Sequence, residues 1–177
     1  QIALGLGSQR ASLESGQSQS ELRRLAPDAV LIGNLGGAQL AGKDGLKLAH
    51  AAVQDIRADA LAIHLNPLQE AIQPEGNHDW RGVLAAIEIA VGALNCPVLV
   101  KEVGAGLSGD VVRRLYSIGV RYVDVAAKGG TNWAEIELKR RQATDWSHYK
   151  PFLNYGLSLP DAITQGRAVS ESLCIIA

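Results

Sequence analysis

Groups suited to catalysis and ion binding recur along the chain wherever a short apolar run ends. They lie at or just after the ends of five successive runs and are Ser8, Gln9 and Arg10, then Asn34, then His64 and Asn66, then Lys101 and Glu102, and last Thr131. Arginine and lysine suit an anion, histidine can carry a proton near neutral pH, and hydroxyl and amide groups orient a bound molecule. The pattern predicts one ligand site assembled from several loops.

The segment 64–76 adds a carboxylate to these groups. Glu70 is a hard oxygen donor of the kind that binds Mg²⁺, which commonly takes one or two carboxylates together with substrate phosphate oxygens. Gln69 beside it is a neutral amide, suited to orienting a substrate rather than to donating a proton. A lone loop carboxylate is also explained by solvation, so the metal site and a solvated loop both stay open for Glu70.

Two glycine motifs could bind phosphate. The first, Gly104-Ala-Gly-Leu-Ser-Gly109, matches G-x-G-x-x-G, follows a strand pattern and precedes Asp124, so a Rossmann NAD site is an alternative. Lys101 and Glu102 directly before these glycines argue against it, because that fingerprint normally follows a plain apolar strand end. In the second motif, 129–131, free backbone N–H groups and the Thr131 hydroxyl suit a phosphate, although Thr131 could simply cap a helix.

Alternating strand and helix patterns must position these groups. Six runs rich in Val, Ile, Leu and Ala predict buried parallel strands, over 1–8, 29–36, 58–66, 97–104, 121–127 and 172–177. Helical patterns between them are clearest over 43–56, 79–94, 108–118 and 134–141. Ser108 and Asp79 are predicted N-caps. The alternation predicts an α/β fold, a barrel or a doubly wound sheet, in which ligands bind at the carboxyl ends of the strands.

The third run shows how a strand would aim its polar groups. Ala60, Ala62, His64 and Asn66 share one face of 58–66, and the large apolar side chains between them share the other. The large side chains are expected to face helices, and the small ones leave room for a flat ligand. His64 as a satisfied core histidine and Asn66 as a turn former are the alternatives.

Composition narrows the class of protein. The chain has 177 residues, of which 47% are hydrophobic and 20% charged, and its net charge is −1. Neither a nucleic-acid surface nor a membrane span is expected from these values. The two cysteines lack metal-type or redox-type spacing, which fits a reducing cytoplasm. One domain over residues 1–177 is predicted.

Five stretches together resemble the type 2 isopentenyl-diphosphate isomerase family. They are GLGSQRA (5–11), NLGGAQL (34–40), HLNPLQEAIQPEGNHDW (64–80), VKEVGAGLS (100–108) and DVAAKGGTNW (124–133). The resemblance covers essentially the whole chain but only about the middle half of the family's length. It implies a (β/α)₈ TIM barrel that is incomplete here, with about strands two to seven present, since a full barrel needs about 250 residues.

The resemblance also implies a function. The family isomerises isopentenyl diphosphate to dimethylallyl diphosphate in isoprenoid biosynthesis, with reduced FMN as acid and base, Mg²⁺, and NADPH as a reductant of the flavin. The expected binding partner is a small-molecule diphosphate substrate. The chain is also expected to form a homo-oligomer, either a tetramer or an octamer. By position, Ser8, Gln9, Arg10 and Gln69 match substrate-binding residues, and Ser8, Asn34, Lys101 and Thr131 match flavin-binding residues. His64, Asn66 and Gln69 match the catalytic polar cluster, and Glu70 matches the Mg²⁺ ligand.

Some positions depart from the family. Ala126 stands where a serine is common, and Ala127 and Lys128 replace a glycine and a small residue. The family's N-terminal Arg-Lys motif and its glycine-rich phosphate segment do not fall within the chain. An FMN-dependent 2-hydroxy-acid oxidase and a non-catalytic truncated barrel therefore remain as alternative functions.

Overall fold

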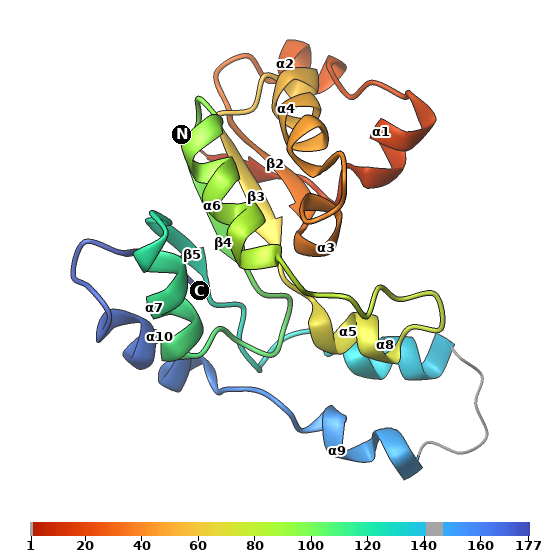
Figure 1. The fold of residues 1–177 in the computed structure, drawn as a ribbon, viewed down its shortest axis with the longest axis vertical. Coiled ribbons are helices and arrows are strands. Elements are labelled where there is room, and N and C mark those ends of the chain that lie inside the picture. The colour runs from red at the N-terminus through yellow and green to blue at the C-terminus, as the bar shows by residue number, and fades with distance from the viewer. Residues whose placement is uncertain (1, 141–146) are drawn as a thin grey trace.

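Six parallel strands form one curved sheet in the computed structural model, which describes residues 2–140 and 147–177. The strands are β1 (Ala3–Gly5), β2 (Val30–Gly36), β3 (Ala60–His64), β4 (Val98–Lys101), β5 (Tyr122–Asp124) and β6 (Cys174–Ile176). Their order in the sheet is their order in the chain, so each strand pairs with the next after a crossover. The result is an α/β domain with a half-barrel sheet (Figure 1).

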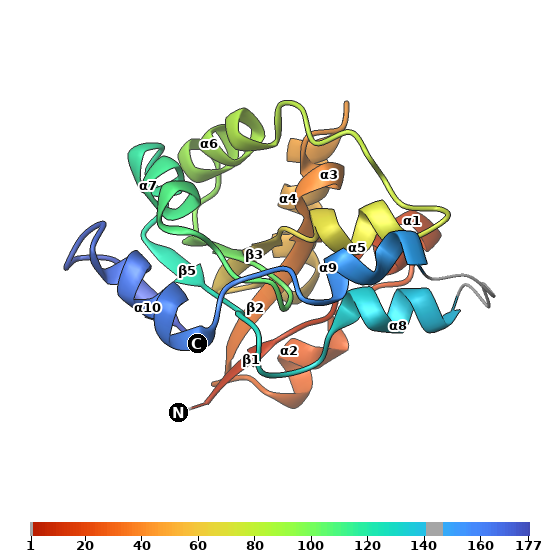
Figure 2. The same cartoon turned by 90° about the horizontal axis from the view of Figure 1, so that it is seen from below.

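The connecting helices divide into two groups. In chain order the helical segments are α1 (Arg10–Ser15), α2 (Glu21–Leu25), α3 (Gly37–Leu40), α4 (Gly45–Ile56), α5 (Pro67–Ile72), α6 (Val83–Ala93), α7 (Gly109–Ser117), α8 (Trp133–Arg140), the 3₁₀ turn η1 (Ser147–Tyr149), α9 (Lys150–Leu153) and α10 (Leu159–Arg167). Helices α4, α6, α7 and α10 lie along the outside of the sheet, whereas α5, α8 and α9 lie beyond the carboxyl end of β3 (Figures 1 and 2).

The expected (β/α)₈ TIM barrel is wrong for this chain. The sheet has six strands in the order β1 to β6, and within the described residues β1 and β6 do not pair with each other. A closed barrel requires its first and last strands to be hydrogen-bonded, with a strand number and stagger that fit the circumference. Six short strands span only part of that circumference, so the sheet curves but stays open.

The six predicted strand regions each contain a strand, but the strands are shorter than the apolar runs. Gln1 and Arg141, at the ends of two predicted elements, lie outside the described residues. The Ser108 hydroxyl caps α7 by accepting a hydrogen bond from the Val111 N–H, as predicted. The predicted cap at Asp79 is wrong, because α6 begins at Val83 after Gly82, which has φ 77°. Asp79 instead pairs with Arg81.

The alternation predicted for β3 is confirmed. Leu61 and Ile63 are fully buried in the core, which also contains Ala52 of α4 and Ile87 of α6. Burying an aliphatic side chain of this size contributes roughly 1.5–3 kcal/mol, so the outer layer of helices holds the sheet in shape. Among the described residues, no helix is long and apolar enough to cross a bilayer.

A buried arginine ties together the end of the sheet opposite the ligand loops. The Arg23 guanidinium donates to the backbone oxygens of Pro27, Ala29 and Arg57 at 3.1, 2.8 and 2.8 Å. It also meets the Asp59 carboxylate at 2.7 Å, and that carboxylate accepts the Leu31 N–H at 2.8 Å. The Leu31 N–H and then Arg23 hold the pKa of Asp59 below its usual value.

Replacing Arg23 with Met should destabilise the domain by about 2–3 kcal/mol, because three backbone acceptors and a carboxylate lose their donor. The lower end of the range for a broken buried pair applies, since the Asp59 side chain is 49% exposed and can rehydrate. Urea unfolding measures the change. The matched control is Arg24→Met, because Arg24 forms an exposed pair with Glu21. Equal unfolding midpoints for the two variants would show that the network does not stabilise the fold.

Candidate functional site

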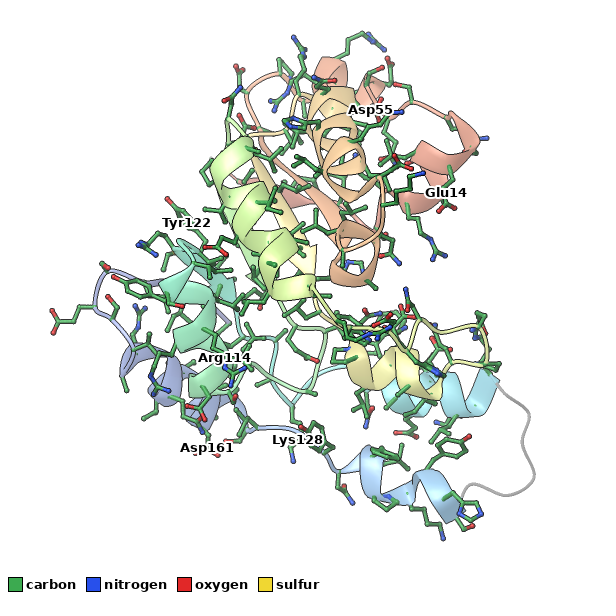
Figure 3. All side chains as sticks on the ribbon, in the orientation of Figure 1. Glu14, Asp55, Arg114, Tyr122, Lys128 and Asp161 are labelled. Carbon is green, nitrogen blue, oxygen red and sulfur yellow. The ribbon has the colours of Figure 1, made fainter. Side chains whose placement is uncertain are left out.

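A cavity of about 810 Å³ opens at the carboxyl ends of the strands, on the side where α5 and α8 lie. Figure 3 shows side chains crowded between the sheet and α5. Nine of the ten predicted site residues line the cavity: Ser8, Arg10, Asn34, His64, Asn66, Gln69, Glu70, Lys101 and Thr131. They come from loops distant in sequence, and the parallel topology brings them together because all the strands end on one side.

Gln9 is the predicted site residue that does not line the cavity. Its side chain is completely buried, where the amide donates to the Ala52 oxygen at 3.2 Å and accepts the Asn34 N–H at 2.9 Å. These bonds fasten β2 to α4 and leave no part of Gln9 for a substrate. The geometry therefore favours a structural role for Gln9 over substrate contact. Its neighbours Ser8 and Arg10 point to the cavity instead.

His64 is held in one orientation by Asn34. The Asn34 amide nitrogen donates to the Leu6 oxygen at 2.8 Å, so its oxygen faces His64 Nδ1, also at 2.8 Å. Nδ1 must then carry the proton, which leaves the Nε2 atom as an acceptor. Burial, and then the charge of Lys101, lowers the pKa of His64 from 6.5 to about 4. His64 is thus a neutral hydrogen-bonding group at neutral pH and not a cationic acid.

This depressed pKa predicts an acid-sensitive fold. The folded state resists protonation of His64 down to pH about 4, whereas the unfolded chain takes up the proton below 6.5. The unfolded state therefore binds more protons in that window, and stability is lost as the pH falls through it, by about 3 kcal/mol in total. Urea midpoints measured from pH 7 to 4 should fall more steeply for the wild type than for His64→Gln. Parallel curves would contradict the assignment.

The start of α5 places an amide and a carboxylate at the cavity wall. Asn66 is buried, and its amide donates to Gln69 at 3.3 Å and to Glu70 at 3.0 Å. The other Glu70 oxygen accepts the Asn77 N–H at 2.6 Å, which ties the carboxylate to the following loop. Each carboxylate oxygen keeps a second lone pair, so Glu70 can still coordinate a cation.

A metal ion at Glu70 would need most of its ligands from elsewhere. In the described ranges, no cluster of three or more His, Cys, Asp or Glu side chains converges on one point. Mg²⁺ tolerates such a site, because it usually keeps several waters and binds through one or two carboxylates plus phosphate oxygens. The donor set therefore fits Mg²⁺ carried by a diphosphate and does not fit a zinc site, which needs three or four protein ligands.

Glu137 of α8 is a buried carboxylate that the sequence patterns did not reveal. Only 4% of it is exposed, and it accepts hydrogen bonds from Gln69 at 2.9 Å and Gln73 at 2.6 Å. Arg140 pairs with it at 2.9 Å and also with Glu75 at the cavity rim. Because Glu137 lies 68 residues after Gln69, only the packing of α8 on α5 brings them together. The period of α8, which places Glu137 on the face of Ala134 and Leu138, was the available signal.

Among the described residues, most backbone donors of the first glycine motif already have a protein acceptor. The N–H groups of residues 103–106 all donate to Glu102, and the N–H of Leu107 donates to the Val125 oxygen. Farther on, the Gly109 N–H donates to Gln165 and the Val111 N–H to Ser108. A Rossmann site needs those amides for the pyrophosphate. The structure thus argues against the NAD alternative.

The second glycine motif, 129–131, leaves its backbone amides available to a ligand. Within the described residues, the amides of Gly129, Gly130 and Thr131 have no protein acceptor, and a Cβ at either glycine would meet nothing within 4 Å. Asn132, rather than Thr131, caps α8 by accepting the Glu135 N–H at 3.1 Å. The neighbouring Lys128, which is labelled in Figure 3, donates to the Asn154 oxygen at 3.2 Å. Free amides, open space and a hydroxyl at the cavity fit a phosphate group.

The fold and the cavity define an α/β domain with a cavity, lined by Arg10, Lys101 and other polar side chains, at the carboxyl ends of its strands. No family model matches the chain. Three curated relatives are each named isopentenyl-diphosphate delta-isomerase. The proteins of Cronobacter sakazakii and Xanthobacter autotrophicus are each 49% identical to this chain, and each alignment covers 99% of this chain and 52% of the relative. The protein of Synechocystis sp. is 45% identical, and its alignment covers 99% of this chain and 51% of the relative.

The chain thus spans about half the length of the curated relatives that it matches. The name that these relatives share does not distinguish type 1 from the flavin-dependent type 2. Among solved structures, 3-hexulose-6-phosphate synthase aligns over 99% of this chain and 98% of its own, with 16% identity and a TM-score of 0.42. That score is too low to support an argument.

Proposed function

We propose that the chain carries the cofactor- and substrate-binding region of a flavin-dependent isopentenyl-diphosphate isomerase. The observation that carries the proposal is the single cavity that Arg10, His64, Gln69, Glu70 and Lys101 line together. Relatives with the isomerase name, 45–49% identical over 99% of the chain, support the reaction. The residues that match the type 2 family support the flavin.

The cavity offers separate places for the two charged parts of the ligands. The free amides of 129–131 suit the FMN phosphate, and Lys101, on the neighbouring strand, suits a flavin ring that becomes negative on reduction. Arg10 and Glu70, which line the same cavity, suit the substrate diphosphate, directly and through Mg²⁺. Different residues are thus assigned to flavin binding and to diphosphate binding.

Reduced FMN, when bound, would supply the acid and base for the allylic proton transfer, after reduction by NADPH or another donor. The chain's own side chains then have to orient the carbon skeleton. Gln69, fixed by Asn66 at 3.3 Å and Glu137 at 2.9 Å, would hold the reacting end. Neutral His64 would accept a hydrogen bond there without competing as an acid.

A reconstitution tests the proposal. The longest polypeptide that contains this chain is stripped of flavin, and conversion of isopentenyl to dimethylallyl diphosphate is followed with FMN, Mg²⁺ and NADPH each left out in turn. We expect turnover only with reduced FMN and Mg²⁺, and dithionite should replace NADPH. Turnover without flavin would contradict the flavin-dependent mechanism, and no turnover in the complete mixture would contradict the reaction.

A further inference from the structure

The Glu102 carboxylate lies inside the turn that its own chain makes after β4. Its Oε2 atom accepts hydrogen bonds from four consecutive backbone N–H groups, those of residues 103–106, at distances from 2.5 to 3.0 Å. The residue is only 6% exposed. Gly104 at φ 143° and Gly106 at φ 89° allow the amides to converge on one point. Residues with a Cβ atom rarely adopt these positive φ angles.

An amide nest of this kind ordinarily binds an external anion. Here the anion belongs to the chain, and its negative charge offsets the partial positive charges of four N–H groups away from water. Without Glu102 these donors would be unsatisfied in a buried turn, which is costly. The turn would have to change shape, or another small anion would have to enter.

The same turn forms part of the ligand cavity. The Lys101 ammonium donates to the backbone oxygen of Glu102 at 2.7 Å, and Val103 and Gly104 line the cavity. The Leu107 N–H then donates to the Val125 oxygen at 3.2 Å, which joins the turn to the chain after β5. A shift in the turn would therefore move the acceptor that holds Lys101 as well as the adjoining wall.

We propose that Glu102 is a positioning residue, a built-in anion that fills the nest of residues 103–106 and thereby holds Lys101 and the cavity wall in the geometry that binds flavin. The inference rests on the proposed function for its ligand, but the filled nest itself does not. Glu102 does not line the main cavity, although it lines a smaller one with residues 129–131. Its Oε2 atom is already taken by four N–H groups, so we assign its effect to Lys101 and the turn and not to contact with the ligand.

Chemical rescue tests the inference. In Glu102→Ala the nest is empty, and excess sodium formate can supply a carboxylate of the right size, whereas sodium gluconate at equal ionic strength carries an anion too bulky to enter. Glu102→Gln, which keeps the size and one acceptor oxygen, covers the case in which the alanine variant does not fold. Glu88→Ala on α6 is the matched control, because Glu88 is exposed and distant from the nest. Melting temperature without flavin, and FMN affinity by fluorescence quenching, are measured for each protein.

We expect Glu102→Ala to melt at a lower temperature and to bind FMN at least roughly tenfold more weakly. Formate should restore both properties, and it should leave the wild type and Glu88→Ala unchanged. Glu102→Gln should lie between the wild type and the alanine variant in both measurements. If the alanine variant does not fold, FMN affinity of Glu102→Gln within twofold of the wild type would overturn the inference.

Recovery of the melting temperature without recovery of FMN affinity would reduce Glu102 to a structural residue and overturn its positioning role. An alanine variant that behaves like the wild type, or is indifferent to formate, would overturn the filled nest. If the wild type itself binds no FMN, the proposed function fails instead, and rescue of the melting temperature by formate still decides the nest.

Discussion

Replacing Glu70 with Gln is expected to reduce Mg²⁺-dependent isomerase turnover on the order of 100-fold or more while FMN stays bound. An amide is a poor ligand for Mg²⁺ and cannot offset its charge, and Glu70 is the carboxylate at the start of α5 that faces the cavity. Flavin binding should survive, because none of the proposed flavin contacts, Ser8, Asn34, Lys101 and Thr131, lies on α5. Turnover and flavin content are measured on the longest polypeptide that contains this chain.

Glu135→Gln is the matched control for that experiment. Glu135 lies on α8 and pairs with Lys139 of the same helix at 2.8 Å, with 45% of the Glu135 side chain and 64% of the Lys139 side chain exposed. Its replacement should change neither turnover nor flavin content. Simultaneous loss of flavin and activity in Glu70→Gln would place Glu70 in the flavin site and contradict its assignment to Mg²⁺.

Replacing Lys101 with Ala is expected to weaken FMN binding by roughly ten- to a hundredfold and to make the flavin reduction potential more negative. A cation beside the ring stabilises the anionic reduced form more than the oxidised form, so its removal disfavours reduction. Equilibrium titration and redox titration against a dye measure the two effects. Lys139→Ala, which removes an exposed lysine of α8, is the control.

A Lys101→Ala protein whose flavin potential and affinity both match the wild type would refute the assignment of Lys101 to the flavin. Lys101→Arg separates charge from shape. It keeps the positive charge, so the potential should stay close to that of the wild type even if the affinity falls because the longer side chain fits less well.

The sequence was sufficient for the parts of the fold that depend on local pattern. The β3 alternation correctly placed Leu61 and Ile63 toward the helices, and the end of that strand brings His64 and Asn66 to the cavity. Ser108 caps its helix because an N-cap requires only a hydroxyl within three residues of its donor. Such features are decided within a few residues of chain.

The sequence failed where distant segments decide the outcome. Gln9 resembles a substrate ligand by position, but contacts with α4, 43 residues away, bury it completely. Glu137 was missed because its partner Gln69 lies 68 residues earlier. Closure of the sheet depends on whether the outer strands pair, and no local pattern encodes that pairing. Glu102 was seen as an argument against a Rossmann site, but its four amide donors depend on the positive φ values of two glycines.

The helices that carry Gln69, Glu70 and Glu137 do not rest on the main core. Ile72 of α5 packs with Ala134 and Leu138 of α8 in a small apolar cluster of its own, with Leu68, Tyr149 and Leu153 at its edge. In Figures 1 and 2 these two helices lie side by side, beyond the strand ends. A unit with so little buried area opens at a lower free energy than the sheet does. The cavity wall formed by α5 and α8 can therefore fluctuate, and exchange its amide hydrogens with solvent, while the strands and their outer helices stay folded.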